Sequence, residues 1–400
     1  MKKLLLVLSF IIIPSMLFAN GFFLYEVSPS SIAQGGATIA AGNDAASVFT
    51  NPASITRLDG LNFSLNLNMY LSDSEFTSEV SKKTTSAETG IFPTPSFFAT
   101  YKAHKFVSVG LGTYAAYGLG ISWPDNWEGY SLVKSSELQS YSIQPSIAIG
   151  PFYGFSIGAG FDIVFGAVTV QQGVPFGDSV FAKMKLGGTT VGYGNNVGIF
   201  YEPAKFIRVG AHYRSQVLMK LDDGKVDFDD VPAPFSANLK DQKVKTGLIL
   251  PQFVGLGVRV TPMDNLEIEL DANEVYWSSY KVLTFEFEDT SLNQKQEKNW
   301  EDAPQFRLGA KYKYKKWDIM AGFIYDISPI PDETLDPMLP DHYRLDYCLG
   351  AGYSFGKFRV DASYMFVNIL ERTVKADKNP FPGTYDAAVH SFALGFSGSL

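Results

Sequence analysis

The sequence predicts an all-β fold: a transmembrane antiparallel β-barrel of about 14 strands, with a small N-terminal plug, or hatch, inside its lumen. Three observations lead to this prediction. Apolar and polar residues alternate with period two, often over the length of about ten residues that a tilted strand needs to cross a membrane. The connections between these segments are alternately short and long. A stretch of small residues precedes the first segment.

The first 19 residues are predicted to form a signal peptide. Lys2 and Lys3 precede an apolar run, Leu4–Phe18, and Ala19 supplies a small residue for cleavage. The run is too short for a comfortable transmembrane helix, and no later stretch approaches the roughly 18 consecutive apolar residues that such a helix needs. We therefore expect an exported chain.

The stretch at 20–58 is crowded with Gly, Ala, Ser and Thr and reads poorly as a long helix or a strand. Small residues let backbone pack closely in a confined space. A flexible N-terminal tail is the alternative on composition alone. A barrel of about 14 strands has a lumen wide enough to need filling, so we expect a plug here.

Residues 59–400 are predicted to form the barrel. In Leu266–Asn273, four apolar residues alternate with two glutamates, an aspartate and an asparagine, and the other segments behave similarly. Short turns on one rim and long loops on the other are typical of outer-membrane barrels. The predicted strands lie near 62–71, 95–104, 105–117, 138–150, 153–170, 181–202, 205–221, 245–262, 264–288, 299–314, 316–328, 341–356, 357–375 and 386–400.

Composition and motifs disfavour several other functions. The formal net charge is −8 and no stretch concentrates Lys or Arg, so we expect no nucleic-acid partner. The single cysteine, Cys348, leaves no internal disulfide. No G-x-S-x-G elbow is present, and no histidines stand at metal-ligand spacing. We expect no enzyme, no cofactor and no metal site.

Several short motifs occur in a characteristic order. They include Gly21-Phe22, Asn51-Pro52-Ala53, Trp123-Pro124-Asp125, Asn299-Trp300 and Ser328-Pro329-Ile330-Pro331-Asp332. In this order the chain resembles the FadL/TodX (OMPP1) family of outer-membrane transporters for long-chain fatty acids and other hydrophobic molecules. It departs from the family in having Ala115-Ala116 where a proline is usual near the third strand, and in ending at Leu400 rather than at an aromatic residue.

The resemblance implies uptake of a hydrophobic ligand in four steps: capture by the loops, binding in a pocket, rearrangement of the plug and lateral release at a kinked third strand. The implied gate residues belong to the plug. They are Phe22, Phe23, Gly35, Gly36, Asn51, Pro52 and Ala53. Gly110 and Gly112 are expected to weaken and bend the third strand at the lateral opening.

Two groups of residues are candidates for ligand contact. Apolar loop residues either form the capture groove or only pack on each other; they are Val174, Phe176, Val231, Pro234 and Phe235. Cations that face the lumen either bind a ligand carboxylate or form structural ion pairs; they are Arg208, Arg214, Arg307 and Lys311.

The expected location is the outer membrane of a Gram-negative-type bacterium. The expected partners are a long-chain fatty acid or hydrocarbon ligand, outer-membrane lipid and lipopolysaccharide, and the barrel-assembly machinery, with the protein itself a monomer. A general porin, or a structural barrel without specificity for hydrophobic ligands, is the alternative. The sequence does not separate fatty acids from aromatic or alkane hydrocarbons.

Overall fold

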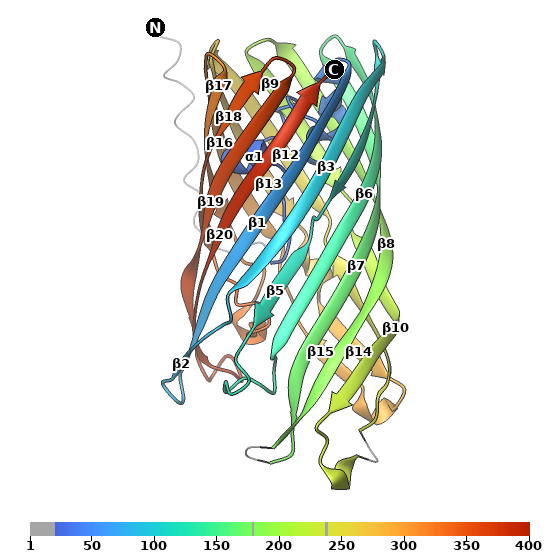
Figure 1. Cartoon of the computed structure of the whole chain (residues 1–400), viewed down its shortest axis with the longest axis vertical. Helices are drawn as coiled ribbons and strands as arrows, with labels where there is room; N and C mark the ends of the chain where they lie inside the picture. The colour runs from blue at the N-terminus through green and yellow to red at the C-terminus, as the bar shows by residue number, and fades with distance from the viewer. Residues whose placement is uncertain (1–20, 178–179, 237–238) are drawn as a thin grey trace.

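A computed structural model describes residues 21–177, 180–236 and 239–400 of the chain. The predicted signal peptide at 1–19 lies outside the described residues. The strands form one antiparallel sheet that closes into a barrel of 14 spanning strands (Figure 1). No helix in the described ranges is long and apolar enough to cross a membrane.

The N-terminal elements are α1 (Pro29–Ala33), α2 (Ser47–Thr50) and the 3-10 turn η1 (Pro52–Arg57). The strands are β1 (Leu61–Ser78), β2 (Thr84–Ser86), β3 (Gly90–His104), β4 (Val107–Tyr114), β5 (Gly118–Ser122), β6 (Ser135–Phe152), β7 (Phe155–Pro175), β8 (Phe181–Ala204), β9 (Ile207–Arg214), β10 (Val217–Asp229), β11 (Gln242–Leu250), β12 (Phe253–Met263), β13 (Leu266–Val275), β14 (Val282–Phe287), β15 (Gln294–Glu297), β16 (Ala303–Tyr314), β17 (Trp317–Asp326), β18 (Arg344–Phe355), β19 (Phe358–Val374) and β20 (Gly383–Ser399).

The barrel closes where its first and last strands meet. β1 pairs with β20 from Asn62↔Ser399 to Ser78↔Gly383, and on its other side it pairs with β3. Closure removes the exposed strand edges that invite aggregation. Some spanning strands are interrupted: β4 and β5 form the third strand, β9 and β10 the seventh, and β11 and β12 the eighth.

Four predicted strands need correction. Those expected over 205–221 and 245–262 are interrupted at 215–216 and 251–252. The strand expected over 105–117 ends at Tyr114 and resumes at Gly118. The strand expected over 264–288 ends at Val275, because the chain turns at Trp277–Ser279 and buries Trp277. β14, which follows, pairs with β11 and β15.

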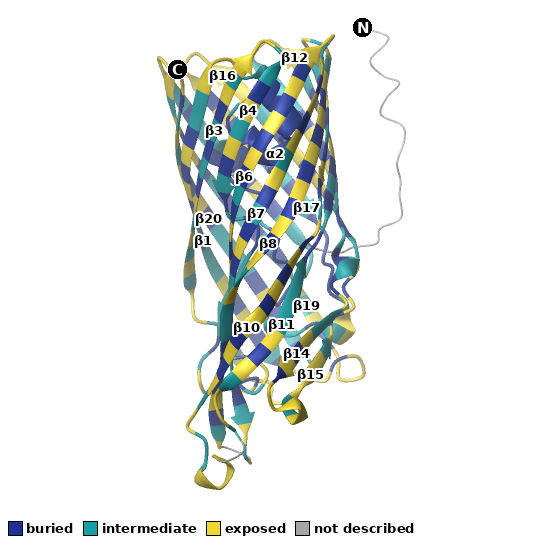
Figure 2. Ribbon diagram, turned by 90° about the vertical axis from the view of Figure 1, so that its right-hand side faces the viewer, coloured by how far each residue is buried: buried dark blue, intermediate teal, exposed yellow. Residues whose placement is uncertain are grey.

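Side chains alternate across the barrel wall, as Figure 2 shows by the banding along β7, β8 and β17. Leu270 is 57% exposed on the outside, whereas its neighbours Glu269 and Asp271 are fully buried inside. An apolar exterior with charged groups facing the lumen is the arrangement of an outer-membrane barrel. Exposed aromatic residues gather at the short turns and mark one membrane interface; they are Phe152, Tyr153, Phe155, Phe206, Tyr314, Trp317, Phe355 and Phe358.

The described N-terminal segment, residues 21–58, lies within the barrel. α1 contacts β17 to β20, while η1 contacts β4, β6, β7 and β8, so the segment reaches more than one part of the inner wall. Almost all of its residues are buried. Figure 1 shows α1 behind the wall strands, near the rim with the short turns.

Candidate functional site

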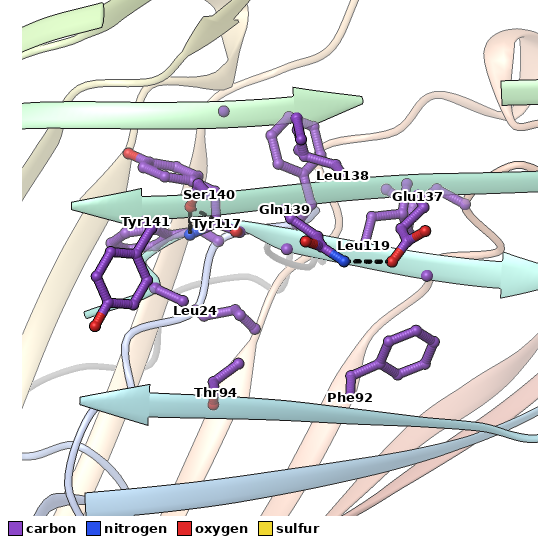
Figure 3. Close-up of a pocket in the computed structure, with 18 of the residues that line it drawn as sticks. Leu24, Phe92, Thr94, Tyr117, Leu119, Glu137, Leu138, Gln139, Ser140 and Tyr141 are labelled. Carbon is purple, nitrogen blue, oxygen red and sulfur yellow. Dashed lines mark hydrogen bonds between the residues drawn. The ribbon is translucent and has the colours of Figure 1, made fainter. Parts of the chain in front are cut away.

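The third spanning strand opens a seam in the barrel wall. β3 pairs with β4 only from Phe97 onward, and its residues Gly90–Ser96 pair with β1 alone in the described part of the chain. β5 pairs with β6. The stretch Gly90–Ser96 therefore faces β5 without a hydrogen-bonded ladder, and we call this gap the seam. Figure 3 shows Phe92 and Thr94 on one side of it and Leu119 on the other.

The local sequence of β3 explains why its edge is left unpaired. Pro93 and Pro95 lie in the seam portion, opposite Met69 and Leu67 of β1. Proline has no backbone N–H to donate and is found in sheets mainly on edge strands. These two prolines favour an open edge, and sequence reasoning had overlooked this signal.

The N-terminal segment is joined to the break in the third strand. The Leu24 N–H donates to the Ala116 carbonyl at 2.8 Å, and the Gly118 N–H donates to the Phe22 carbonyl at 3.0 Å. Phe23 and Tyr117 are antiparallel bridge partners. A few residues of the N-terminal segment thus replace the strand pairing that the break removes.

A chamber of about 1240 Å³ lies beside the seam. From inside the barrel, Phe22 and Phe23 line it. It is also lined by residues whose side chains are exposed on the outer face of the wall, including Tyr141, Phe165 and Leu218, which are 40–48% exposed. The chamber therefore reaches from the N-terminal segment to the membrane-facing side of the barrel.

An apolar recess of about 110 Å³ continues from the chamber, with which it shares Phe22 and Leu119. Its other walls come from strands β6 to β14 and are nearly all hydrocarbon. They include Val168, Met219, Leu248, Leu283 and Phe285. Such a lining suits an alkyl chain or an aromatic ring.

The predicted gate residues Asn51, Pro52 and Ala53 form a close junction between the N-terminal segment and the wall. The Asn51 amide donates to the carbonyls of Ile39 at 2.9 Å and of Ile199 on β8 at 3.0 Å. The wall carries no side chain at this point, because Gly158 of β7 faces the segment. A Cβ on Gly158 would lie 2.5 Å from the Ala53 nitrogen. Real side chains do not approach so closely, so glycine is required for this contact.

Gly35 and Gly36 follow α1 with φ of +61° and +67°, a conformation that favours glycine. A Cβ on Gly309 of β16 would lie 2.5 Å from the Gln34 carbonyl oxygen, and one on Gly322 of β17 would collide with the Gly35 nitrogen. The turn after α1 therefore packs directly against the backbone of β16 and β17, where the wall has no side chain.

Gly110 and Gly112, the residues predicted for the lateral opening, do not lie at the break in the third strand. They belong to the regularly paired part of β4, between β3 and β6. A Cβ on Gly110 would lie 2.6 Å from Val48 Cγ2, so these glycines make room for α2. The interruption itself falls at 115–117, where the departure from the family's usual proline had left the shape of the kink open.

Two lumen cations hold the backbone of the N-terminal segment. Arg208 donates to the Ala41 carbonyl at 2.7 Å and pairs with Glu267. Arg307 donates to the Gly35 carbonyl at 3.0 Å and lies over the Tyr25 ring. Both arginines are at most 3% exposed.

The other two cations are also engaged. Arg214 donates to Asp162 at 2.7 Å and to the Phe49 carbonyl at 3.3 Å, and Lys311 pairs with Glu267 at 2.6 Å. None of the four cations is among the described residues that line the chamber or the recess. Their geometry favours the structural ion pairs that the sequence also allowed.

The predicted loop residues come together in part. The rings of Phe176 and Phe235 pack at a centroid distance of 4.6 Å, and Phe235 is 44% exposed. Val174 lies at the end of β7 and packs against a buried cluster around Met184. The two loops thus share an apolar contact on the rim with the long loops.

Among the described residues, no group of three His, Cys, Asp or Glu side chains is arranged to hold a metal ion.

The chain is similar to known proteins over most of its length. The model of the family described as outer membrane protein transport protein (OMPP1/FadL/TodX) matches residues 10–399. A long-chain fatty acid transport protein of Escherichia coli O6:H1 is 27% identical over 408 residues, which cover 88% of each chain. A relative of the same description from Salmonella typhi is 25% identical over 425 residues, covering 96% of this chain and 95% of that one.

Two solved structures share the fold. A Pseudomonas aeruginosa FadL homologue superposes with a TM-score of 0.82 and 19% identity, over 95% of this chain and 100% of its own. The Ralstonia pickettii toluene transporter TbuX gives a TM-score of 0.71 and 19% identity, over 92% and 97%.

Proposed function

Because the chain belongs to the OMPP1/FadL/TodX family of outer membrane transport proteins, we propose that it takes up long-chain fatty acids or other hydrophobic small molecules and releases them sideways into the membrane. Members of this family are transporters rather than enzymes, and this chain is an outer-membrane protein. Contact with lipopolysaccharide, assembly by the barrel machinery and a monomeric state remain predictions.

The proposal rests on one observation above all: the chamber joins Phe22 and Phe23 inside the barrel to Tyr141 and Phe165 on its membrane-facing side, beside the seam. A hydrophobic ligand that leaves through such a gap avoids an aqueous lumen. Keeping each CH₂ group out of water is worth about 0.8 kcal/mol, a free energy that exit through an aqueous lumen would forfeit.

The height of the seam supports exit near the outer edge of the apolar band. Ala115 lies about nine residues beyond the turn at Phe106, which corresponds to roughly 20–25 Å along the membrane normal at the usual rise and tilt of barrel strands. The apolar band of such barrels is about 25 Å tall.

The N-terminal segment is placed to gate this exit. Phe22, Phe23 and Leu24 line the chamber. Leu24 donates to the Ala116 carbonyl, and Phe22 accepts from the Gly118 N–H. In our proposal the ligand enters from the long loops, passes the recess and displaces these residues. Their displacement removes the contacts that hold the break in the third strand closed.

The test is uptake by Gram-negative cells that lack their own transporter of this kind. Cells that express the full chain should take up radiolabelled oleate or toluene faster than cells with an empty vector, while their permeability to maltose stays low. Thr94→Trp, which places an indole in the seam, should slow uptake at least fivefold. Tyr101→Trp, on the outer face of the same strand where it pairs regularly with β4, is the control.

Equal uptake of oleate and toluene with and without the protein would refute the proposal. High maltose permeability and ion conductance would instead favour the general porin. Normal uptake by a correctly assembled Thr94→Trp variant would refute lateral release at the seam while leaving transport itself intact.

A further inference from the structure

The seam is closed at both ends by hydrogen bonds between its two sides. Toward the short turns, Phe97 of β3 pairs with Thr113 of β4. Toward the long loops, the Glu88 N–H donates to the Ser122 carbonyl at 2.7 Å, and Ser122 Oγ donates to Glu88 Oε2 at 2.6 Å. On each side the two ends are nine residues apart, which is about 30 Å at the usual rise of a strand. A ligand that leaves through the seam must pass between these two ends.

The ring of Phe92 occupies the half of the seam nearer to the long loops. Figure 3 shows it pointing from β3 toward the strand that carries Leu119. A Cβ on Gly120 of β5 would collide with this ring, and one on Gly90 of β3 would lie 2.5 Å from Phe92 Cζ. Glycine in a strand often marks such a close approach. The ring therefore bridges the gap, packed against one glycine on each strand.

Leu24 of the N-terminal segment occupies the other half of the seam. Its N–H is bonded to the Ala116 carbonyl, and a Cβ on Gly118 would lie 3.1 Å from Leu24 Cδ1. Leu24 is partly exposed, whereas the residues on either side of it, 21–23 and 25–29, are buried. This exposure is what a side chain that fills an opening in the wall should show.

The two side chains that fill the seam belong to different parts of the molecule. Leu24 lies on the N-terminal segment, so the displacement of that segment in the proposed function removes it. Phe92 lies on β3, which stays paired with β1 through contacts such as Tyr70↔Phe92. Movement of the N-terminal segment therefore clears one half of the seam and leaves the Phe92 ring across the other.

We propose that Phe92 sets the width of the ligand that can leave through the seam. The inference rests on the proposed function and adds a specificity-determining residue to it. A ligand as narrow as one alkyl chain passes through the half that Leu24 vacates. A wider ligand also requires the Phe92 ring to turn away from Gly120 into the chamber, which the ring already lines.

The test compares two ligands that share a head group and an alkyl chain and differ in width: oleate, and dodecanoate with a terminal pyrene. Uptake of each is measured in cells that express the full chain and lack their own transporter of this kind. The quantity of interest is the ratio of the pyrenyl rate to the oleate rate. Phe92→Ala should raise this ratio at least fivefold, and Phe92→Trp should lower it at least twofold.

Phe306→Ala is the matched control for the loss of a ring. Phe306 is 47% exposed on the membrane-facing side of β16, away from the seam. The ratio of the two uptake rates in this variant should equal that of the wild type.

Gly120→Ala tests the place of the ring. The added methyl group would collide with the Phe92 ring and turn it into the chamber, so the ratio should rise at least twofold. In a Phe92→Ala background no ring remains to be displaced, so Gly120→Ala should add nothing. Independent, additive effects of the two substitutions would overturn the inference, because they would show that Gly120 acts without the ring.

The outcomes separate this inference from the proposed function. Oleate uptake that does not depend on the protein would refute both. Protein-dependent oleate uptake that Thr94→Trp slows, with one ratio shared by the wild type, Phe92→Ala and Phe92→Trp, would overturn the role of Phe92 and leave the function standing. Heat-modifiable migration reports that each barrel is folded. Should Phe92→Ala fail to assemble, Phe92→Leu, which keeps an apolar side chain but removes the ring, should raise the ratio at least twofold.

Discussion

Leu24 donates its backbone N–H to the carbonyl oxygen of Ala116 at 2.8 Å, which ties the N-terminal segment to the interruption of the third barrel strand. The bond joins a segment in the lumen to a defect in the wall. Any movement that carries Leu24 inward must break it. In our proposal, movement of the N-terminal segment and opening of the side exit therefore occur together.

A disulfide at this junction should lock the exit. Phe23 and Tyr117 are bridge partners, so cysteines at both positions are close enough to pair. In a Cys348→Ala background, the oxidised Phe23→Cys/Tyr117→Cys variant should take up oleate about tenfold more slowly than the same variant after reduction. The reduced form of the same variant also lacks the two aromatic rings, so it controls for their loss. Equal uptake in both states, with the disulfide demonstrated by mass spectrometry, would contradict the gate.

A side chain added to the barrel wall next to Ala53 should displace the N-terminal segment. Gly158→Val would place a side chain where the Ala53 nitrogen and the Pro52 carbonyl carbon lie within about 2.5 Å of a Cβ. We expect the segment at 39–53 to lose protection from hydrogen exchange and oleate uptake to change at least threefold, while the barrel still assembles. Ala159→Val adds the same bulk on the outer face of β7 and should change neither. Unaltered protection in Gly158→Val would show that the contact between Gly158 and Ala53 does not hold the segment in place.

The barrel wall could be predicted from the sequence because its signal is local. Period two places Leu270 outside and Asp271 inside, and the structure has them 57% and 0% exposed. The turn at Trp277 was missed because the alternation continues past it, and only the burial of that indole in the lumen ends the strand.

The details of the site depend on contacts between distant parts of the chain. Gly110 and Gly112 suggest a weak strand, and in the structure they also make room for Val48, a contact that no local pattern reveals. The break at 115–117 depends on Phe22 and Leu24, almost a hundred residues earlier in the chain. Pro93 and Pro95 were a readable signal for the open edge.

The buried pair Arg214–Asp162 should be costly to break. Arg214 also donates to the Tyr114 hydroxyl at 2.9 Å, so Arg214→Met leaves an uncompensated carboxylate in the lumen. We expect the free energy of unfolding to fall by about 3–5 kcal/mol. Adding Asp162→Asn should restore part of it. Lys102→Met, in an exposed pair with Asp59, should cost less than about 1 kcal/mol. Urea unfolding in lipid vesicles measures the wild type and all three variants, and similar losses for Arg214→Met and Lys102→Met would contradict the role of the buried pair.

The contact between Phe176 and Phe235 separates capture of the ligand from its later passage. If these rings collect ligand at the long loops, Phe176→Ser combined with Phe235→Ser should slow oleate uptake at least threefold at low ligand concentration and leave the maximal rate unchanged, because the seam and the recess are untouched. Val80→Ser removes an apolar side chain that is 81% exposed on another loop and should have no effect. A concentration series of uptake rates distinguishes the outcomes. If the double variant lowers the maximal rate alone, or changes nothing, the rings only pack on each other and capture occurs elsewhere.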